Sequence, residues 1–303
     1  MPLTSATLGR GLALLLVCLL LSPTVASSRD RIRQVRSWAY QLQKVDVDQL
    51  ATSPYELIVI DHADERLVPW DPAVIEQLRN ATGSPRLVLA YLSIGEAEDY
   101  RPYWNPAWRQ EAPEWMGASN PNWRGNYPVK YWHPQWREIL LGFGGYVDIL
   151  LAQGFDGFYL DRVDVYEKWG PTGSGPGDRE ESARTMVALV RAIAHHVRTV
   201  RKRENAIIVA QNAPELSRVS GYLDAVDALA LEDLLYESGL SRSTRAVERR
   251  LRGFVGPLME QGVPVFTVDY MSRTWAARRY ERLLRRLGAI PYAAPSTALD
   301  RVR

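Results

Sequence analysis

The stretch Gly154-Phe-Asp-Gly-Phe-Tyr-Leu-Asp161 decides the fold of this 303-residue chain. A glycine stands where a helix would end, a short apolar run follows without alternation, and an aspartate closes the run. Glycine is common just past a helix end, and continuous apolar runs are typical of strands buried on both faces of a parallel sheet. The stretch therefore predicts a helix end that leads into a buried parallel strand.

Short apolar runs of the same kind recur along the chain, and helical patterns separate many of them. The predicted strands are Trp38–Gln43, Leu57–Asp61, Leu87–Gly95, Gly157–Asp161, Ile207–Asn212, Ala228–Glu232, Val265–Tyr270 and Ile290–Ala294. The predicted helices are Asp71–Asn80, Gln135–Ala152, Asp178–Arg203, Thr244–Gln261 and Thr274–Leu287. Eight such strands predict an α/β fold, a single-domain (β/α)8 TIM barrel. The alternative, an open doubly wound sheet, usually has a glycine-rich turn after its first strand, and this chain has none.

Residues 1–26 have the pattern of an export signal. Arg10 precedes the apolar run Gly11–Leu21, which is shorter than the ~20 apolar residues that span a bilayer. Ala26 stands at the small-residue position of a cleavage site. We expect cleavage to leave a domain of residues 27–303 that is secreted or periplasmic and does not stay inserted in the membrane. An uncleaved N-terminal anchor is the alternative.

The composition narrows the class of function. A net charge of +2 argues against binding of nucleic acid by the whole molecule, and the single cysteine excludes an intramolecular disulfide. The 10 Trp and 15 Tyr outnumber the 5 Phe, and aromatics with a polar edge suit binding clefts. Five of these Trp lie in a long loop, residues 96–134, after the third predicted strand. A glycine-rich stretch, residues 170–177, could be a lid or a linker.

Acidic residues gather at the predicted carboxyl ends of the strands, where barrels of this kind place their active sites. The strand-end residues are Gln41, Gln43, Asp61, Glu96, Asp161, Asn212, Glu232 and Asp269, and Glu98 and Asp164 stand just beyond. Clustered carboxyl groups raise one another's pKa and cost stability, so the cluster favours a functional use. Glycoside hydrolysis is one such use, because it needs two carboxyl groups about 5–9 Å apart.

Other chemistries have less support in the sequence. Asp161 and Asp164 could hold a divalent cation through oxygen ligands, which is the main rival use of these acids. Of the four histidines only His62 follows a strand end, which gives poor support for zinc or iron. No lysine ends a predicted strand, and no phosphate-binding loop is present. We therefore predict no cofactor and no resident metal.

Several blocks together resemble one enzyme family. They are Ser37-Trp-Ala-Tyr-Gln-Leu-Gln43, Ala90-Tyr-Leu-Ser-Ile-Gly-Glu-Ala-Glu-Asp-Tyr-Arg101, Gly154-Phe-Asp-Gly-Phe-Tyr-Leu-Asp-Arg-Val-Asp164, Gln211-Asn212 and Leu231-Glu-Asp233. With these blocks in this order, the chain resembles glycoside hydrolase family 114, the endo-α-1,4-polygalactosaminidases. It resembles most the bacterial secreted branch of that family, which was once mislabelled as cysteinyl-tRNA synthetase-related. The resemblance spans about residues 36–295.

The resemblance implies a TIM barrel that cleaves galactosamine-containing polysaccharide. It implies Asp161 and Glu232 as the catalytic pair, with Asp269 as a rival on the seventh strand. The substrate site would then be lined by Tyr40, Asp61, Tyr91, Glu96, Glu98, Asp164 and Asn212. A partly deacetylated polymer carries ammonium groups, which an acidic barrel mouth would attract.

Two other functions stay open at this point. A non-catalytic polysaccharide-binding or export-accessory protein would bind the polymer without shortening it. A metal-assisted hydrolase or deacetylase would use Asp161 and Asp164, and a chelator would inhibit it.

Overall fold

A computed structural model describes residues 26–81, 83, 86–171, 179–237, 240–241 and 244–303. The predicted signal peptide, residues 1–26, lies outside this range except for Ala26. The glycine-rich stretch 170–177 lies mostly outside it as well.

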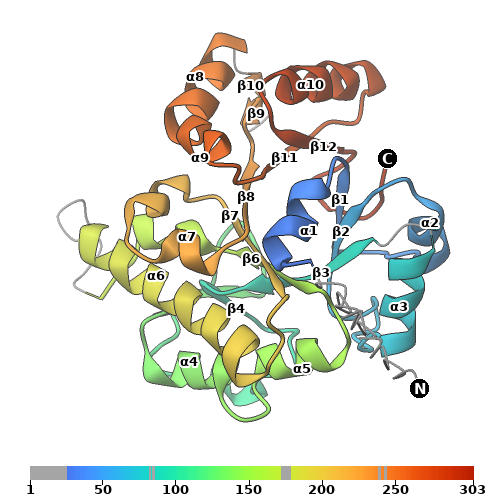
Figure 1. Cartoon of the computed structure of the whole chain (residues 1–303). Helices are drawn as coiled ribbons and strands as arrows, with labels where there is room; N and C mark the ends of the chain where they lie inside the picture. The colour runs from blue at the N-terminus through green and yellow to red at the C-terminus, as the bar shows by residue number, and fades with distance from the viewer. Residues whose placement is uncertain (1–25, 82, 84–85, 172–178, 238–239, 242–243) are drawn as a thin grey trace, which may run out of the picture.

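Eight parallel strands form the central sheet, which curls into a nearly closed barrel (Figure 1). In spatial order they are β1 (Trp38–Gln41), β2 (Leu57–Ile60), β3 (Leu87–Ser93), β6 (Gly157–Asp161), β7 (Ile207–Gln211), β8 (Ala228–Glu232), β11 (Val265–Tyr270) and β12 (Ile290–Ala294). Every predicted strand is present and begins at the predicted residue. Four strands, β1, β2, β3 and β7, end one or two residues earlier than predicted. The TIM-barrel prediction is confirmed.

Helices surround the strands (Figure 1). They are α1 (Ser28–Gln34), α2 (Val47–Thr52), α3 (Pro72–Asn80), α4 (Pro134–Leu141), α5 (Tyr146–Ala152), α6 (Arg179–His195), α7 (Tyr222–Ala225), α8 (Thr244–Phe254), α9 (Gly256–Glu260) and α10 (Thr274–Arg286). Short 3₁₀ turns cover Pro106–Arg109, Val163–Glu167 and Pro214–Arg218, and a π-helical turn, His196–Val200, continues α6.

Three of the predicted helices needed correction. The predicted helix Gln135–Ala152 is two helices, since three of the four residues 142–145 are glycines, which are poor helix formers. The predicted helix Thr244–Gln261 divides into α8 and α9, because Pro257 lacks the N–H that a continuous helix needs and stands instead in the first turn of α9. The third, Asp178–Arg203, changes to a π-helical turn after His195.

Two glycines of the stretch 154–161 are required by the backbone. Gly154 has a φ of +87°, the left-handed conformation that follows a helix end. At Gly157 an added Cβ would lie 1.9 Å from the carbonyl oxygen of Ile207 on β7, so no side chain fits there. Gly154 thus lets the chain turn from α5 toward β6, and Gly157 lets β6 lie close against β7, with Asp161 at its carboxyl end.

Aromatic rings fill the barrel interior. The Trp38 ring lies 5.4 Å from the Phe266 ring and 5.8 Å from the Tyr292 ring, and the Tyr40 and Tyr159 rings are 5.0 Å apart. The indole N–H of Trp38 on β1 donates to the carbonyl oxygen of Ile290 at the start of β12, at 2.9 Å. Large rings thus pack the core and hold the two end strands of the sheet together.

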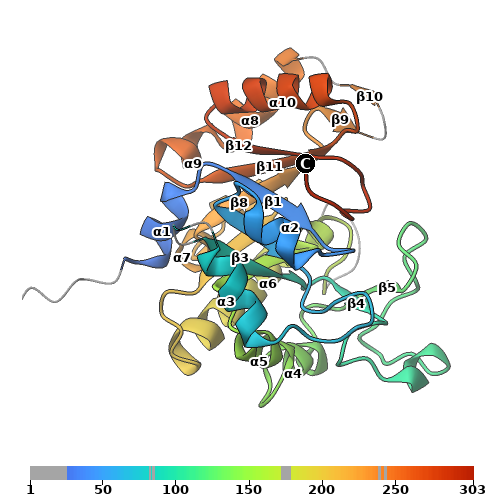
Figure 2. The ribbon, with the colours of Figure 1, turned by 90° about the vertical axis from the view of Figure 1, so that its right-hand side faces the viewer.

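Two small hairpins extend from the barrel. β4 (Glu96–Glu98) pairs antiparallel with β5 (Asn126–Pro128), and β9 (Tyr236–Glu237) with β10 (Leu240–Ser241). The β4–β5 hairpin and the loop between its strands project to one side of the barrel (Figure 2). This hairpin returns the long aromatic loop to the carboxyl ends of the strands.

Candidate active site

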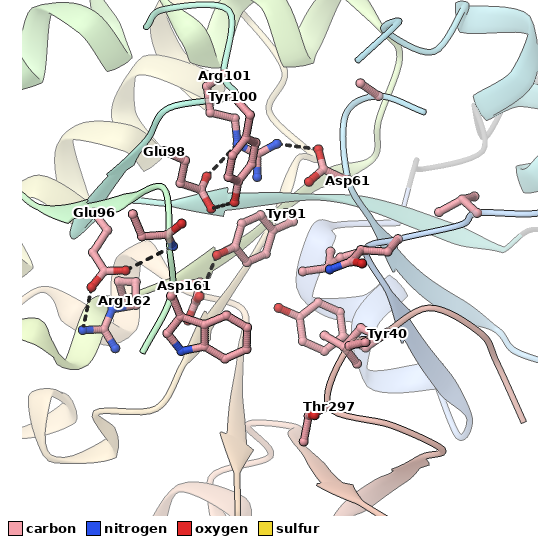
Figure 3. Close-up of a pocket in the computed structure, with 18 of the residues that line it drawn as sticks. Tyr40, Asp61, Tyr91, Glu96, Glu98, Tyr100, Arg101, Asp161, Arg162 and Thr297 are labelled. Atoms are coloured by element: carbon pink, nitrogen blue, oxygen red, sulfur yellow. Dashed lines mark hydrogen bonds and ion pairs between the residues drawn. The ribbon is translucent and has the colours of Figure 1, made fainter. Parts of the chain in front are cut away.

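A pocket of about 490 Å³ lies at the carboxyl ends of the barrel strands. We call it the central pocket, and its size is typical of a ligand site. Eight of the ten predicted site residues line it, namely Tyr40, Asp61, Tyr91, Glu96, Glu98, Asp161, Asn212 and Glu232. Figure 3 shows several of them converging from different strands.

Asp161, the last residue of β6, is held by one hydroxyl group in this pocket. The Tyr91 hydroxyl donates to its Oδ2 at 2.7 Å. Burial raises the pKa of Asp161 to about 6, although the Tyr91 hydrogen bond and the Arg162 charge both lower it. The carboxyl group can therefore gain or lose its proton near neutral pH.

Glu232, the last residue of β8, has two donors of its own. The Gln211 side-chain amide donates to Oε2 at 2.6 Å, and the Tyr270 hydroxyl donates to Oε1. Burial raises the pKa of Glu232 to about 7, and the charge of Asp161 adds to the rise. Since Asp161 has the lower pKa, the pair is set up to hold one proton on Glu232 while Asp161 is ionised.

The chain makes a left-handed turn directly after three neighbouring strands. Arg162 after β6, Asn212 after β7 and Asp233 after β8 have φ values of 59°, 58° and 55°. This conformation is unfavourable for most residues, and such positions concentrate at functional sites. The turns after β6 and β8 follow Asp161 and Glu232 directly, so these two acids end their strands where they line the pocket.

The acids on the opposite wall differ from this pair because a buried arginine neutralises them. The Arg101 guanidinium, with a side chain 1% exposed, bonds to Glu98 at 2.6 Å and to Asp61 at 2.5 Å. Burial alone would raise the pKa of Asp61, but Arg101 and His62 outweigh it and lower that pKa to about 2. Asp61 thus stays ionised throughout the neutral range and is unsuited to proton transfer. From the sequence, Arg101 was placed only in the block Ala90–Arg101, without a role.

Glu96 binds the β4–β5 hairpin to the barrel. Its carboxylate accepts from Asn120 at 2.9 Å and from Asn126 at 3.3 Å, and it pairs with Arg162 at 3.2 Å. Figure 3 shows this group beside Asp161. Glu96 therefore holds both the hairpin and the turn after β6.

Most tryptophans of the long loop stabilise the loop itself. Trp104 packs edge-on against Trp108 at 5.2 Å, and Trp108 packs against Trp115 at 5.1 Å. Trp123 differs, because it lines the central pocket and is 58% exposed. Trp123 is therefore available to a ligand in the central pocket, whereas this cluster packs within the loop.

Two predicted site residues lie outside the central pocket. Asp269 is fully buried, and its carboxylate accepts from the backbone N–H groups of Leu234 and Leu235 at 3.1 and 3.0 Å. Side chains of a strand alternate between faces, so the next residue, Tyr270, reaches the pocket instead. Asp164 pairs with Arg162 at 3.8 Å beside the pocket without lining it.

Sequence reasoning did not predict several residues that line the central pocket, among them Gln211, Tyr270, Arg162 and Trp123. Gln211 was visible in the block Gln211-Asn212, but nothing in the sequence showed that its amide donates to Glu232.

Among the described residues, no cluster of three or more His, Cys, Asp or Glu could hold a metal ion. In the same part of the chain, every helix is too short or too polar to cross a bilayer.

The sequence of this chain is similar to that of known proteins. A model of glycoside-hydrolase family GH114 matches residues 22–293. An uncharacterized protein of Methanocaldococcus jannaschii is 35% identical over 271 residues, which cover 86% of this chain and 75% of that protein. An uncharacterized protein of Deinococcus radiodurans is 35% identical over 283 residues, covering 92% and 86%.

Solved structures share the fold. The glycoside hydrolase domain of PelA from Pseudomonas aeruginosa has a TM-score of 0.67 and 21% identity, over 88% of this chain and 97% of that domain. Ega3 from Aspergillus fumigatus, solved in complex with galactosamine, has a TM-score of 0.62 and 17% identity, over 88% and 92%. Because the family match covers most of the chain, this protein belongs to glycoside-hydrolase family GH114 and is a glycoside hydrolase.

Proposed function

We propose that this glycoside hydrolase cleaves α-1,4 linkages in a partly deacetylated galactosamine polysaccharide, with Asp161 as nucleophile and Glu232 as general acid and base. The observation that carries the proposal is the pair of buried carboxyl groups in one pocket, with pKa values raised to about 6 and about 7. Such a pair supplies one ionised and one protonated carboxyl group at the same pH.

The proposed reaction has two steps. In the first, Glu232 donates its proton to the glycosidic oxygen while an Asp161 oxygen bonds to the anomeric carbon, and the C–O bond to the leaving sugar breaks. In the second, the Glu232 carboxylate takes a proton from water, and the water oxygen displaces Asp161 from the anomeric carbon. Both carboxyl groups then return to their starting protonation states.

The charge of the central pocket supports an amino-sugar substrate. Among the described residues, seven carboxyl groups line it, against the side chains of Lys44, Arg101, Arg124 and Arg162. A deacetylated galactosamine unit carries an ammonium group, which this excess of negative charge would attract. Galactosamine is also the sugar bound to the structural neighbour Ega3.

Export is part of the proposal. The support for it is the pattern of residues 1–26, a short apolar run followed by a small-residue cleavage site. A polysaccharide does not cross the cell membrane unaided, so the enzyme would meet it outside the cytoplasm.

The test uses mass spectrometry of the products formed from partly deacetylated poly-α-1,4-galactosamine. The wild type should release short oligomers, and Asp161→Asn and Glu232→Gln should each lower kcat by roughly 10²-fold or more. The control Asp224→Asn, an exposed acid on α7, should keep the wild-type rate. Because a small nucleophile can replace a lost carboxylate, azide should restore turnover to Asp161→Ala and give a glycosyl azide.

The test also distinguishes the other candidates. Near-wild-type rates in both acid variants would refute the assignment of the pair. An intact polymer with the wild type, together with tight binding, would replace the hydrolase by a polysaccharide-binding protein. Loss of wild-type activity after a chelator would instead favour metal-assisted chemistry.

A further inference from the structure

A second pocket adjoins the central one on the far side of Glu232. We call it the outer pocket, and it has a volume of about 840 Å³. Trp275 and Arg273, at the start of α10, form part of its wall. Four residues line both pockets, namely Trp123, Glu232, Tyr270 and Thr297.

The positions of the two proposed catalytic carboxyl groups indicate which pocket binds the sugar that is retained and which binds the sugar that leaves. Asp161 lines the central pocket but not the outer one, whereas Glu232 lines both. A nucleophile contacts the anomeric carbon of the sugar that is retained, and a general acid contacts the oxygen between that sugar and the leaving one. The wall that contains Glu232 therefore marks the cleaved bond, and the outer pocket lies on the leaving side.

We propose that the outer pocket binds the first sugar on the leaving side, that Trp275 is the platform for its ring, and that Arg273 selects an N-acetylated sugar over an amino sugar there. This inference rests on the proposed function, since it takes Asp161 as nucleophile and Glu232 as acid. It adds a specificity that differs between the two sides of the cleaved bond.

The exposure of Trp275 supports a platform. Its side chain is 60% exposed in the first turn of α10, and Trp123, across the shared wall, is 58% exposed. Large aromatic side chains gathered on one exposed surface mark binding sites. The C–H face of a sugar ring can cover such an indole and remove its apolar surface from water.

The charge of the outer pocket differs from that of the central one. Among the described residues, its cation is Arg273 and its acids are Glu232 and Asp233. Glu232 is protonated when it acts as the acid, so the outer pocket then holds about as much positive as negative charge. An ammonium group therefore gains little electrostatic attraction in the outer pocket and is repelled by the Arg273 guanidinium. A neutral N-acetyl sugar is not repelled.

The test reads the sugar on each side of the cleaved bond. A galactosamine polymer of known acetylation is digested, and mass spectrometry identifies both new ends of each product. The wild type should leave galactosamine enriched at new reducing ends and N-acetylgalactosamine enriched at new non-reducing ends. Arg273→Glu should remove the second bias and keep the first.

The platform has a separate readout. Trp275→Ala should lower kcat/KM for the polymer about 10-fold, while hydrolysis of an aryl α-galactosaminide with an activated leaving group changes less than about 2-fold. Trp275→Phe should recover part of the loss. Phe143→Ala, an exposed aromatic residue between α4 and α5, and Arg282→Ala, an exposed cation further along α10, are the matched controls and should behave as wild type.

Three outcomes would overturn the inference. Wild-type kinetics and product ends in both Trp275→Ala and Arg273→Glu would show that the outer pocket does not bind the leaving sugar. An equal loss on polymer and aryl glycoside in Trp275→Ala would show a structural role instead. A wild type that cleaves neither substrate would refute the proposed function, and this inference with it.

Discussion

Tyr91 and Tyr270 each bond to one of the two carboxyl groups that we propose as the catalytic pair. Burial raises the pKa of both acids, and each acid accepts a hydrogen bond from one tyrosine that partly opposes the rise. A hydroxyl that donates to a carboxylate stabilises its ionised form and so lowers its pKa. The two tyrosines therefore set the pH at which Asp161 is charged and Glu232 is not.

At the residue scale we expect a narrow bell-shaped dependence of kcat/KM on pH. Activity should rise as Asp161 ionises through about pH 6 and fall as Glu232 loses its proton through about pH 7, which places the optimum between them. Tyr270→Phe should move the basic limb to higher pH, because Glu232 loses a donor that lowers its pKa. Tyr91→Phe should move the acidic limb to higher pH for the same reason at Asp161.

Steady-state rates between pH 4.5 and 9 check this prediction. The control is Tyr55→Phe, since Tyr55 lies away from the pocket and donates to the Arg303 carbonyl oxygen. Unchanged limbs in both pocket variants would show that the tyrosines do not set these pKa values.

Residue-scale features were the hardest to predict from sequence. Asp269 and Tyr270 are neighbours in one predicted strand, and which of them faces the pocket depends on a register that the sequence does not show. The cation that neutralises Asp61 and Glu98 is Arg101, but proximity in the sequence did not reveal that its side chain is buried between them.

The strands themselves were predictable at the scale of elements. Most are continuous apolar runs, because helices cover one face of the sheet and the barrel interior covers the other. Since a strand end also places the side chain that follows it, eight of the ten predicted site residues do line the central pocket. The outer pocket could not, because Trp275 and Trp123 come from a helix and a distant loop without a shared pattern.

Arg86 joins several elements at the amino-terminal side of the barrel. The guanidinium is buried and donates to the backbone oxygens of Leu50 at 2.7 Å, Ser53 at 2.6 Å and Tyr55 at 2.6 Å. These carbonyl groups lie in the last turn of α2 and in the link from α2 to β2. Arg86 thus supplies donors that the end of this helix lacks.

At the element scale we expect Arg86→Ala to lower the free energy of unfolding by about 3 kcal/mol or more, because it leaves several buried carbonyl groups without donors. Urea denaturation measures the change. Arg282→Ala, on the exposed side of α10, is the control and should cost less than about 0.5 kcal/mol. A loss below about 1 kcal/mol in Arg86→Ala would contradict the prediction.

At the scale of the whole molecule, the buried carboxyl group of Glu232 lowers the stability of the folded protein. Glu232 has an ordinary pKa of 4.5 and a folded-state pKa of about 7, so the native state binds its proton more tightly than the unfolded state does. Stability is therefore lost as pH rises from about 4.5 to about 7, and the full cost persists above that range. The shift corresponds to up to about 3 kcal/mol.

At the scale of the molecule we expect Glu232→Gln to be inactive but more stable. Its melting temperature should exceed that of the wild type by several degrees at pH 8 and by little at pH 4.5, where Glu232 is protonated in the native state and half protonated in the unfolded state. Calorimetry at the two pH values measures the difference. An equal gain at both would mean that packing, and not ionisation, is responsible.

The left-handed turns after β6, β7 and β8 have a consequence for protein design. Three residues other than glycine hold a conformation that costs roughly 1 kcal/mol each, and the rest of the fold sustains it. The backbone thus fixes the orientation of Asp161 and Glu232 before a sugar binds. A designer who grafted Asp161 and Glu232 alone onto another barrel would transfer the chemistry without its alignment, so the unit to transplant is the strand end together with its turn.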